Sequence, residues 1–359
     1  MSGPRILFLS HTHPFGTYRV GSHHYARVLA RRGADVVHVS TPISFAHRAT
    51  GRVTGDDAAV VPHGPYRDAD GATYLVPRTN LPRPFGVFRV ARELARYGLA
   101  LPFDAVLIDQ PLLWDDTVRA LAPRLVYRPT DHYASGVKVP LQERIVAAAN
   151  GVVATSAEVL RGLGPVTLPA LVLPNGVDAA AFAPPAEASE ARPAVCVYAG
   201  ALDARLDDAQ LAAWARAHPG IRFIVAGQGM LASAALVDNV EMLGPVDYGV
   251  LPALLHGARV GLLPLSDDRL NAGRSPMKLH EYLGAGLAVV ARRTPTITPD
   301  EQTGVFTYAD TEDADAALRS ALEHPSPNTA GIARAAAESW EAKTDTLMDF
   351  IGSLVSSGR

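Results

Sequence analysis

The chain has 359 residues, 48% of them hydrophobic, which is enough apolar material for two domains of ordinary size. Its one cysteine, Cys196, excludes a disulfide framework, and no apolar run reaches the roughly 18 residues of a membrane-spanning helix. Residues 6–9 are too short for the apolar part of a signal peptide, so we expect a cytoplasmic protein, with binding to a membrane surface as the alternative.

The net charge of −3 is unevenly distributed along the chain. Residues 1–172 sum to +6 and residues 173–359 to −9. A basic first half is expected if that half meets an anionic partner, although two domains can also differ in charge by chance. Because the basic residues are scattered and the chain is acidic overall, nucleic acid is not the expected partner.

The first half alternates short apolar runs with helical patterns. A helix is expected to follow Gly21 and Ser22 and to end near Gly33, and residues 41–72 read as a long loop. The expected strands are residues 6–10, 36–39, 105–108, 125–127 and 151–155. This alternation predicts β-α-β units of a parallel sheet.

A second α/β series follows a turn at residues 175–178 and a stretch rich in Ala, Pro and Glu. Its expected strands are residues 195–199, 222–226, 240–243, 260–263 and 287–291, and its last helices are residues 311–323 and 330–354. We therefore predict two doubly wound, Rossmann-like domains, residues 1–173 and 193–359, joined by a linker at 174–192. The last helix is long enough to pack back on the first domain. Such a fold places a ligand crevice between the domains, at the carboxyl ends of the strands.

One predicted helix carries the most chemical information. Ser275 suits its N-cap, and Gly286 suits the left-handed residue that ends it. Lys278 lies in the first turn, and Glu281 follows three positions later on the same face. A helix N-terminus with a lysine suits an anionic phosphate, and the carboxylate suits the hydroxyls of a ribose. The alternative is a solvated Lys and Glu on a surface helix.

Further candidate nucleotide contacts follow the other strands of the second half. Gly200 allows a phosphate to approach the backbone, and Arg205 offers a forked cation. Backbone groups near Met242 are placed to read a base edge. The remaining candidates are Gly227, Gly229, Arg274, Ser275 and Met277. A pair of glycines is by itself more typical of a tight turn than of a phosphate site.

Three segments of the second half, residues 244–252, 261–264 and 276–290, resemble glycosyltransferases of the GT-B fold in order and spacing. Among them the chain is similar to the teichuronic-acid-type transferases and to the glucuronosyltransferase of xanthan synthesis, enzymes of polysaccharide and glycoconjugate biosynthesis. Residues 19–33 and 127–131 carry the likeness in the first half.

The resemblance implies a transferase that moves a sugar from a nucleotide diphosphate, UDP by family frequency, to a hydroxyl acceptor. It implies no cofactor and no metal, with Lys278 on the diphosphate and Glu281 on the ribose. Two departures are present. Gly273 stands where many retaining relatives carry a glutamate, and Ala201 stands where they carry an arginine. Retention of the anomeric configuration is therefore not assumed.

An inverting transfer needs a base for the acceptor hydroxyl. By resemblance to the xanthan enzyme we favour Asp131; an Asx-type cap is the alternative for this residue. His11 and His13, in the loop after the first strand, are the competing candidates. Arg19, Gly21 and His132 are the candidate acceptor contacts. The spacing of the neighbouring histidines follows no familiar metal pattern.

Residues 82–97 mix aromatic residues with arginines. Such a helix can lie on an anionic bilayer and bring the enzyme to a lipid-linked acceptor, or it can cover the sheet with its arginines in water. The other functions weighed are a nucleotide-sugar 2-epimerase, for which no acidic cluster is found, a non-catalytic nucleotide-sugar-binding protein, and a dehydrogenase. The Gly-x-Gly-x-x-Gly turn of the last is missing after the first strand.

Overall fold

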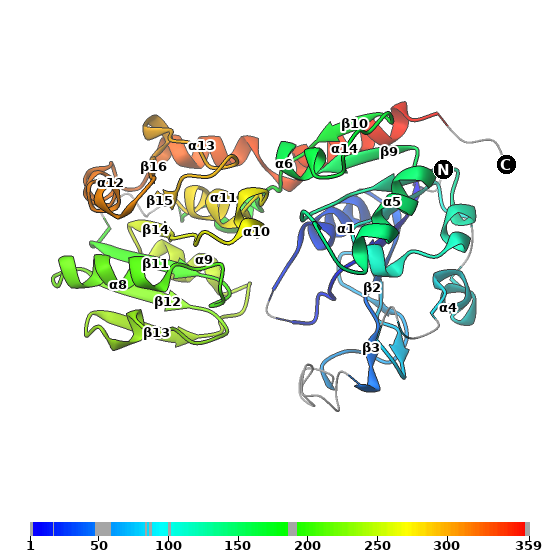
Figure 1. The fold of residues 1–359 in the computed structure, drawn as a ribbon, viewed down its shortest axis with the longest axis horizontal. Coiled ribbons are helices and arrows are strands. Elements are labelled where there is room, and N and C mark those ends of the chain that lie inside the picture. Colours follow the sequence, from blue (N-terminus) through cyan, green and yellow to red (C-terminus); the bar gives the residue numbers. More distant parts are fainter. Residues whose placement is uncertain are drawn as a thin grey trace. The chain divides into compact units, whose positions relative to one another are not determined.

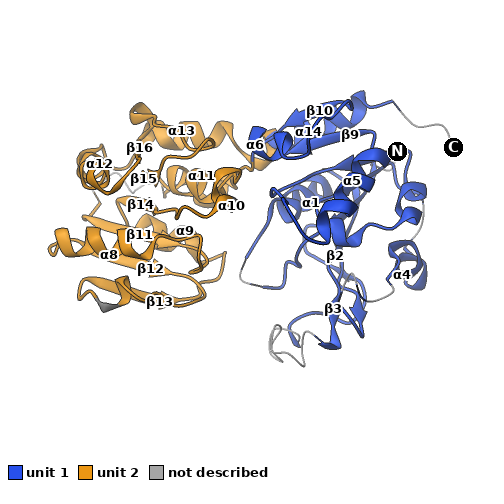
Figure 2. Cartoon of the chain, in the orientation of Figure 1, with its two compact units in different colours: residues 1–174, 343–359 blue, residues 175–342 orange. Residues whose placement is uncertain are grey.

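The computed structural model describes residues 3–16, 18–46, 59–82, 85, 88–99, 102–185 and 192–355. It falls into two compact units (Figure 2). Unit 1 comprises Met1–Pro174 and Lys343–Arg359, and unit 2 comprises Asn175–Ala342. Each unit is a mainly parallel sheet with helices packed on it (Figure 1), so the predicted fold of two Rossmann-like domains is confirmed.

The sheet of unit 1 has eight strands. Their spatial order is β10 (Ala170–Val172), β9 (Gly151–Ala154), β8 (Arg124–Tyr127), β7 (Ala105–Ile108), β1 (Arg5–Ser10), β2 (Asp35–Ser40), β5 (Thr73–Leu75) and β4 (Tyr66–Arg67). All neighbours are parallel except β4 and β5. The chain runs outward from β1 on one side and from β7 on the other, so the strand order reverses between β1 and β7.

Helices and a small second sheet complete unit 1. Its helices are α1 (Gly21–Arg31), α4 (Val90–Arg96), α5 (Lys138–Ala148), α6 (Ala157–Arg161), the 3-10 turns η1 (Pro111–Leu113) and η2 (Asp116–Leu121), and α14 (Trp340–Ser353) from Lys343 onward. Strands β3 (Ile43–Ser44) and β6 (Arg78–Thr79) pair in parallel. The predicted loop at 41–72 is therefore partly wrong, because it contains β3 and β4; residues 47–58 lie outside the described residues.

The six strands of unit 2 are all parallel. Their order is β13 (Val240–Gly244), β12 (Arg222–Ala226), β11 (Val195–Ala199), β14 (Val260–Leu263), β15 (Ala288–Arg292) and β16 (Val305–Tyr308). The helices are α7 (Ala179–Phe182), α8 (Asp208–Ala217), α9 (Leu251–His256), α10 (Arg269–Ala272), α11 (Met277–Gly284), α12 (Thr311–Glu323) and α13 (Thr329–Ala337), with the turns η3 (Ala234–Leu236) and η4 (Glu301–Thr303). The order reverses between β11 and β14.

Both faces of this second sheet are covered. Alternate residues of β11 belong to different cores: Cys196 packs with α8 and α12, and Val197 packs with α11. A parallel strand covered on both faces needs apolar side chains at every position, which explains the continuous apolar runs of the sequence. Burial raises the pKa of the Cys196 thiol to about 12, as expected for a structural cysteine.

Helix α11 begins one residue later than predicted. Its N-cap is Pro276, and no side chain caps it. Ser275 instead accepts a hydrogen bond on its hydroxyl oxygen from the backbone N–H of Asn175, at 2.9 Å, because the turn at 175–178 packs against this residue. Gly286 has φ of +79°, the left-handed conformation expected after a helix.

Two further ranges differ from the prediction. Residues 330–354 form two helices, α13 and α14, because the chain breaks at residues 338–339, where Val177 pairs with the backbone on both sides. The range expected to be a linker contains α7, capped by Asp178, with Phe182 fully buried in unit 2. Among the described residues no helix is both long and apolar enough to cross a membrane.

Candidate functional site

In unit 2, Lys278 lies over the carboxyl end of β11. A Cβ atom on Gly200 would come within 1.9 Å of the lysine Nζ, so the glycine makes the space that this side chain occupies. Nζ donates a hydrogen bond to the hydroxyl of Tyr198 at 3.4 Å and lies 4.8 Å from the centroid of its ring. The Tyr198 hydroxyl in turn donates to the carbonyl of Ala201 at 2.8 Å. The cation is thereby held at the point where the strand order reverses.

The glycines of neighbouring strand ends bring three loops together. The N–H of Gly227 donates to the carbonyl of Gly244 at 2.8 Å, and a Cβ on Gly227 would lie 1.7 Å from the carbonyl oxygen of Gly200. Gly229 has φ of +123°, and a Cβ there would lie 2.2 Å from the carbonyl oxygen of Leu202. Gly227 and Gly229 thus have a structural requirement of their own, which is the close approach of the loops after β11, β12 and β13.

Glu281 is one helical turn from Lys278 and is 4% exposed. The hydroxyl of Tyr248 donates to its Oε1 at 3.1 Å, and no described residue donates to Oε2. Burial raises the pKa of Glu281 to about 7, against the opposing effects of Tyr248 and Lys278. Burial, and to a smaller extent the charge of Arg274, lower the pKa of Lys278 to about 8. Close to neutral pH the site holds a protonated amine and a carboxyl group near its midpoint.

Two arginines flank the lysine. The guanidinium of Arg205 binds the carboxylate of Asp203, with Nε to Oδ1 at 2.8 Å, and this contact lowers the pKa of Asp203. Asn271 holds the loop by donating from Nδ2 to the carbonyl of Arg205 at 2.9 Å. Arg274 is tied through its carbonyl oxygen, which accepts from the hydroxyl of Thr296 at 2.5 Å. Two loops held by hydrogen bonds to their backbone thus carry positive charges near Lys278.

In unit 1, a hydrogen-bond chain joins the loops that follow β1, β7 and β8. Nδ1 of His11 lies 3.1 Å from Nε2 of Gln110, and Nε2 of His11 lies 3.1 Å from the hydroxyl oxygen of Thr130. Thr130 donates to Oδ2 of Asp131 at 3.3 Å. Two of the predicted catalytic residues, His11 and Asp131, are therefore connected through a single threonine at the switch point of this sheet.

A buried polar layer supports this chain from below. Arg128 and Asp109 form an ion pair, 2% and 1% exposed, with Nε 2.9 Å from Oδ1. Ser10 donates to Oδ2 of Asp109 at 3.1 Å and lies 2.7 Å from the hydroxyl of Ser22, which contacts Nε2 of His38 at 3.0 Å. A paired and hydrogen-bonded charge in an apolar core fixes the ends of β1, β7 and β8 relative to one another.

The chain was compared with known proteins, and one family and several solved structures match it. No curated protein matches the chain by sequence. Residues 193–324 match the family Glycosyl transferases group 1. The chain carries a glycosyltransferase group 1 domain. This domain contains Gly200, Arg205, Lys278 and Glu281, so the candidate nucleotide site of unit 2 falls within it.

Solved structures share the fold over nearly the whole chain. HepE from Anabaena, in complex with UDP and glucose, is 14% identical with a TM-score of 0.63, covering 98% of this chain and 100% of that one. A glycosyltransferase from Rickettsia africae is 13% identical, with a TM-score of 0.63 and 98% of both chains covered. A TarM variant from S. aureus, in complex with fondaparinux, α-GlcNAc-glycerol and UDP, is 10% identical with a TM-score of 0.65, covering 98% and 100%. The prediction of a glycosyltransferase with the GT-B fold is confirmed at the level of this domain and the fold.

The other predicted contacts of the group 1 domain are spread around the lysine. Met242 is 38% exposed near the end of β13, and Met277 is half-buried at the start of α11. Ser275 is engaged with Asn175 through both its hydroxyl and its carbonyl oxygen. Their contact with a nucleotide stays a prediction.

The remaining predicted residues of unit 1 lie around His11. His13 packs 5.7 Å from the ring of Phe15, and Arg19 donates to the carbonyl of Gly16 at 2.9 Å. Gly21 is buried as the first residue of α1. The ring of His132 lies over Gly162 at the end of α6 and packs on the backbone there. The structure thus brings His11 and Asp131 together, and the contact of Arg19, Gly21 and His132 with an acceptor stays a prediction.

Part of the segment considered for membrane contact, residues 82–97, packs in the core, whereas Phe85 is 77% exposed. Phe88, Val90 and Leu94 are buried, whereas Arg89 and Arg92 are exposed. Arg83 and Val87 lie outside the described residues. Helix α4 therefore covers the sheet of unit 1 with its arginines outward, and membrane contact stays a prediction.

Several residues of the two sites were not predicted from the sequence, namely Tyr198, Tyr248, Gln110 and Thr130. Tyr198 is the next-to-last residue of a predicted strand, which is the one local signal available. The others act through partners far along the chain, such as Gln110 with His11, 99 positions away. Among the described residues, no three His, Cys, Asp or Glu side chains come together as metal ligands.

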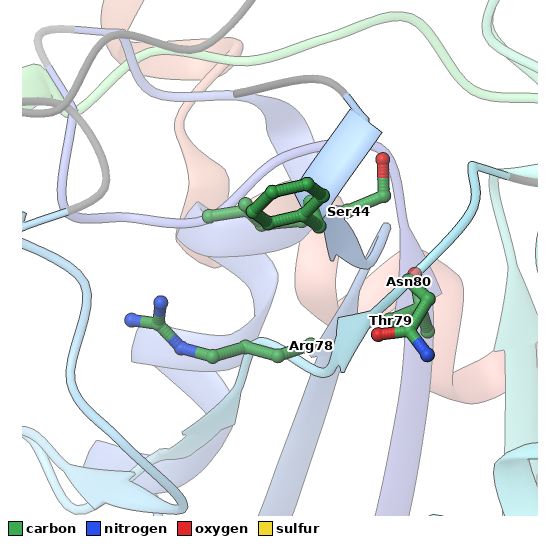
Figure 3. Close-up of a pocket in the computed structure, with 6 residues that line it drawn as sticks. Ser44, Arg78, Thr79 and Asn80 are labelled. Carbon is green, nitrogen blue, oxygen red and sulfur yellow. The ribbon is translucent and has the colours of Figure 1, made fainter. Parts of the chain in front are cut away.

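A separate pocket of about 210 Å³ lies on the small sheet of unit 1 (Figure 3). It is lined by Ile43, Ser44, Phe45, Arg78, Thr79 and Asn80. Arg78 donates from its guanidinium to the carbonyl of Val61 at 3.0 Å, which fixes this wall. None of the predicted site residues lines this pocket.

Proposed function

We propose that the protein transfers a sugar from a UDP-linked donor to a hydroxyl acceptor, without a bound metal ion. The observation that carries the proposal is the position of Lys278. Its ammonium group lies over Gly200, at the carboxyl end of β11, beside the N-terminus of α11. Amide groups at a helix end and a nearby cation together suit a diphosphate. Complexes with UDP among structures of the same fold, HepE and TarM, support the choice of nucleotide.

Each residue of this site has a stated role in the proposal. Lys278 neutralises charge that develops on the departing diphosphate, a need that otherwise falls to a metal ion. Oε2 of Glu281 accepts hydrogen bonds from the ribose hydroxyls, while Oε1 stays with Tyr248. Arg274 adds positive charge beside the phosphates. Asp131, in unit 1, receives the proton of the acceptor hydroxyl.

Thermal denaturation with and without UDP tests the donor site. UDP at 100 times its dissociation constant is expected to stabilise the unit that binds it by roughly 2.7 kcal/mol. Lys278→Ala is expected to abolish this shift, because it removes the cation that holds the diphosphate. Asp131→Asn is expected to keep the shift and to lose turnover of UDP-sugars. A normal UDP shift in Lys278→Ala would refute the assignment of the site.

The acceptor is proposed only by class. A lipid-linked acceptor, contact with an anionic membrane through Arg89 and Arg92, and a cytoplasmic location stay predictions. Flotation with vesicles that contain anionic lipid separates the two interpretations of α4. Co-flotation that is lost when Arg89 and Arg92 are changed to glutamine would support membrane contact, and no co-flotation would leave α4 as a core-covering helix.

A further inference from the structure

In the hydrogen-bond chain of unit 1, all protons are donated in the same direction. This direction is fixed by atoms that can donate a hydrogen bond but cannot accept one. The N–H of Leu112 donates to Oε1 of Gln110 at 3.3 Å, and this contact fixes the orientation of the Gln110 amide. Its nitrogen, Nε2, therefore faces His11 and can only donate a hydrogen bond to it. Nδ1 of His11 must then be the unprotonated, accepting nitrogen of the ring.

The rest of the chain follows from this tautomer. With Nδ1 unprotonated, the ring proton of neutral His11 is on Nε2, which donates to the hydroxyl oxygen of Thr130. The hydroxyl proton of Thr130 is then free to be donated to Oδ2 of Asp131. In each hydrogen bond from Leu112 to Asp131, only one of the two groups can then be the donor. A protonated Nδ1 would oppose the amide hydrogens of Gln110.

We infer that Gln110 and Thr130 are positioning residues, which make His11 a donor and direct the acceptor's proton to Asp131. The inference rests on the proposed function, and it separates the two candidate bases that the sequence left open. The acceptor oxygen forms a bond to the anomeric carbon as the bond to the diphosphate oxygen breaks, and its electron pair leaves with UDP. The acceptor's proton goes to Oδ1 of Asp131, to which no described residue donates.

The surroundings of the chain favour the same protonation state. Burial lowers the pKa of His11, against the effect of Asp109, and Lys138 lowers it further. Lys138 and Tyr133 are the other titratable groups beside Asp131, with Nζ of Lys138 4.3 Å from the centre of the Tyr133 ring. The Arg128–Asp109 ion pair lies on the inner side. His11 is therefore neutral at pH 7, and its tautomer is set by its neighbours.

The direction of the chain can be measured without any substrate. The ¹⁵N NMR spectrum of the His11 ring, assigned by its loss in His11→Gln, is expected to show the proton on Nε2 in the wild-type protein. Gln110→Glu replaces the donor by an acceptor, so the proton is expected to move to Nδ1. A wild-type ring with its proton on Nδ1 would overturn the inference, whether or not the protein transfers sugars.

The consequence for catalysis is tested on Thr130. Thr130→Val removes the hydroxyl at nearly constant volume, and Thr130→Ser keeps it. Thr130→Val takes from the Asp131 carboxylate the hydrogen bond that orients it. It is expected to lower kcat by about tenfold or more, and Thr130→Ser is expected to stay close to wild type.

Controls separate failure of this inference from failure of the proposed function. Unchanged amide hydrogen exchange in β7 and β8 shows that unit 1 is folded in both variants. If the wild-type protein turns over a UDP-sugar and Thr130→Val has the wild-type kcat, the positioning role is wrong. If the wild-type protein turns over no UDP-sugar, the proposed function fails, and the NMR measurement still decides the direction of the chain.

Discussion

At the scale of single residues, burial is the main cause of the pKa shifts of both Lys278 and Glu281, which have opposite signs. Burial disfavours the charged form of each group, so it lowers the pKa of the lysine to about 8 and raises that of the glutamate to about 7. Their mutual attraction acts in the other direction but does not outweigh the burial. The functional states, a charged amine and a charged carboxylate, therefore coexist fully only in a narrow range of pH.

This arrangement predicts that the affinity for a UDP-sugar is highest between about pH 7 and 8. Above about pH 8 Lys278 loses its proton and its attraction for the diphosphate, so affinity falls as pH rises. Below about pH 7 Glu281 is protonated and loses an acceptor for the ribose, so affinity falls as pH decreases. Titration calorimetry with a UDP-sugar measures this, because its diphosphate lacks the ionisation near pH 6 of a terminal phosphate.

Two variants assign the limbs of this profile. In Lys278→Arg the side chain stays charged at all accessible pH. If this variant still binds a UDP-sugar, its affinity is expected not to decrease above pH 8. Glu281→Gln is expected to remove the decrease below pH 7 with a lower affinity throughout. An affinity that is constant from pH 6 to 9 in the wild-type protein would show that these groups do not contact the donor.

At the scale of elements, the loops after β11 and β12 use glycine for two different reasons. A Cβ on Gly227 would meet the backbone carbonyl of Gly200 at 1.7 Å, and backbone held in a sheet cannot move aside cheaply. A Cβ on Gly200 would meet the end of the Lys278 side chain, at 1.9 Å from Nζ, and that end is flexible. One clash changes the fold of the loops, and the other changes the position of the cation.

The two substitutions are therefore expected to separate stability from binding. Gly227→Ala is expected to lower the free energy of unfolding of unit 2 by about 1–3 kcal/mol, measured by denaturant titration. Gly200→Ala is expected to keep most of the stability and to lose UDP affinity by about tenfold or more, since it displaces Lys278. Gly220→Ala is the matched control, because nothing lies within 4 Å of its added Cβ. Equal effects of Gly200→Ala and Gly220→Ala on UDP affinity would contradict this account.

The elements also show what the sequence could predict. Strands β7, β11, β12 and β14 have the predicted bounds, because a strand buried on both faces is an unbroken apolar run with turn residues at its ends. The predicted start of α11 is one residue early. Serine is a typical N-cap residue, but the hydroxyl of Ser275 accepts a hydrogen bond from Asn175, 100 positions away, and does not cap the helix. Local patterns therefore predict buried elements well, and they fail where a distant backbone group uses the side chain.

The same limit holds for the sites. The sequence places Lys278 and Glu281 on one helix and at one strand end, and the order of the strands follows from fold class. It does not contain the contact of Lys278 with Tyr198, nor that of His11 with Gln110, because each joins residues 80 or 99 positions apart. Which of two nearby polar residues accepts a proton depends on such contacts, so Asp131 and His11 stayed alternatives.

At the scale of the whole molecule, the chain returns to its first unit at its end. Helix α14 begins in unit 2, and the residues from Lys343 onward belong to unit 1. Leu347 and Leu354 are buried there, and Leu354 lies against Gly151 of β9. The side chain of Arg124 also donates to the carbonyl of Leu354 at 3.3 Å. The last helix is thus part of the core of unit 1, although the rest of that unit is formed by residues 1–174.

Substitutions in α14 and at Leu354, the residue that follows it, are therefore expected to destabilise the first unit selectively. Leu347→Ala or Leu354→Ala removes a buried side chain and is expected to cost about 2–5 kcal/mol of unfolding free energy in unit 1. Amide hydrogen exchange is expected to accelerate in β8 and β9 and to stay unchanged in β11 and β14, where the UDP shift should also persist. Asp349→Ala, at an exposed position of the same helix, is the control and is expected to leave both units unchanged. Faster exchange confined to unit 2 would assign this segment to the other core, because Leu347 and Leu354 can only stabilise the unit in which they are buried.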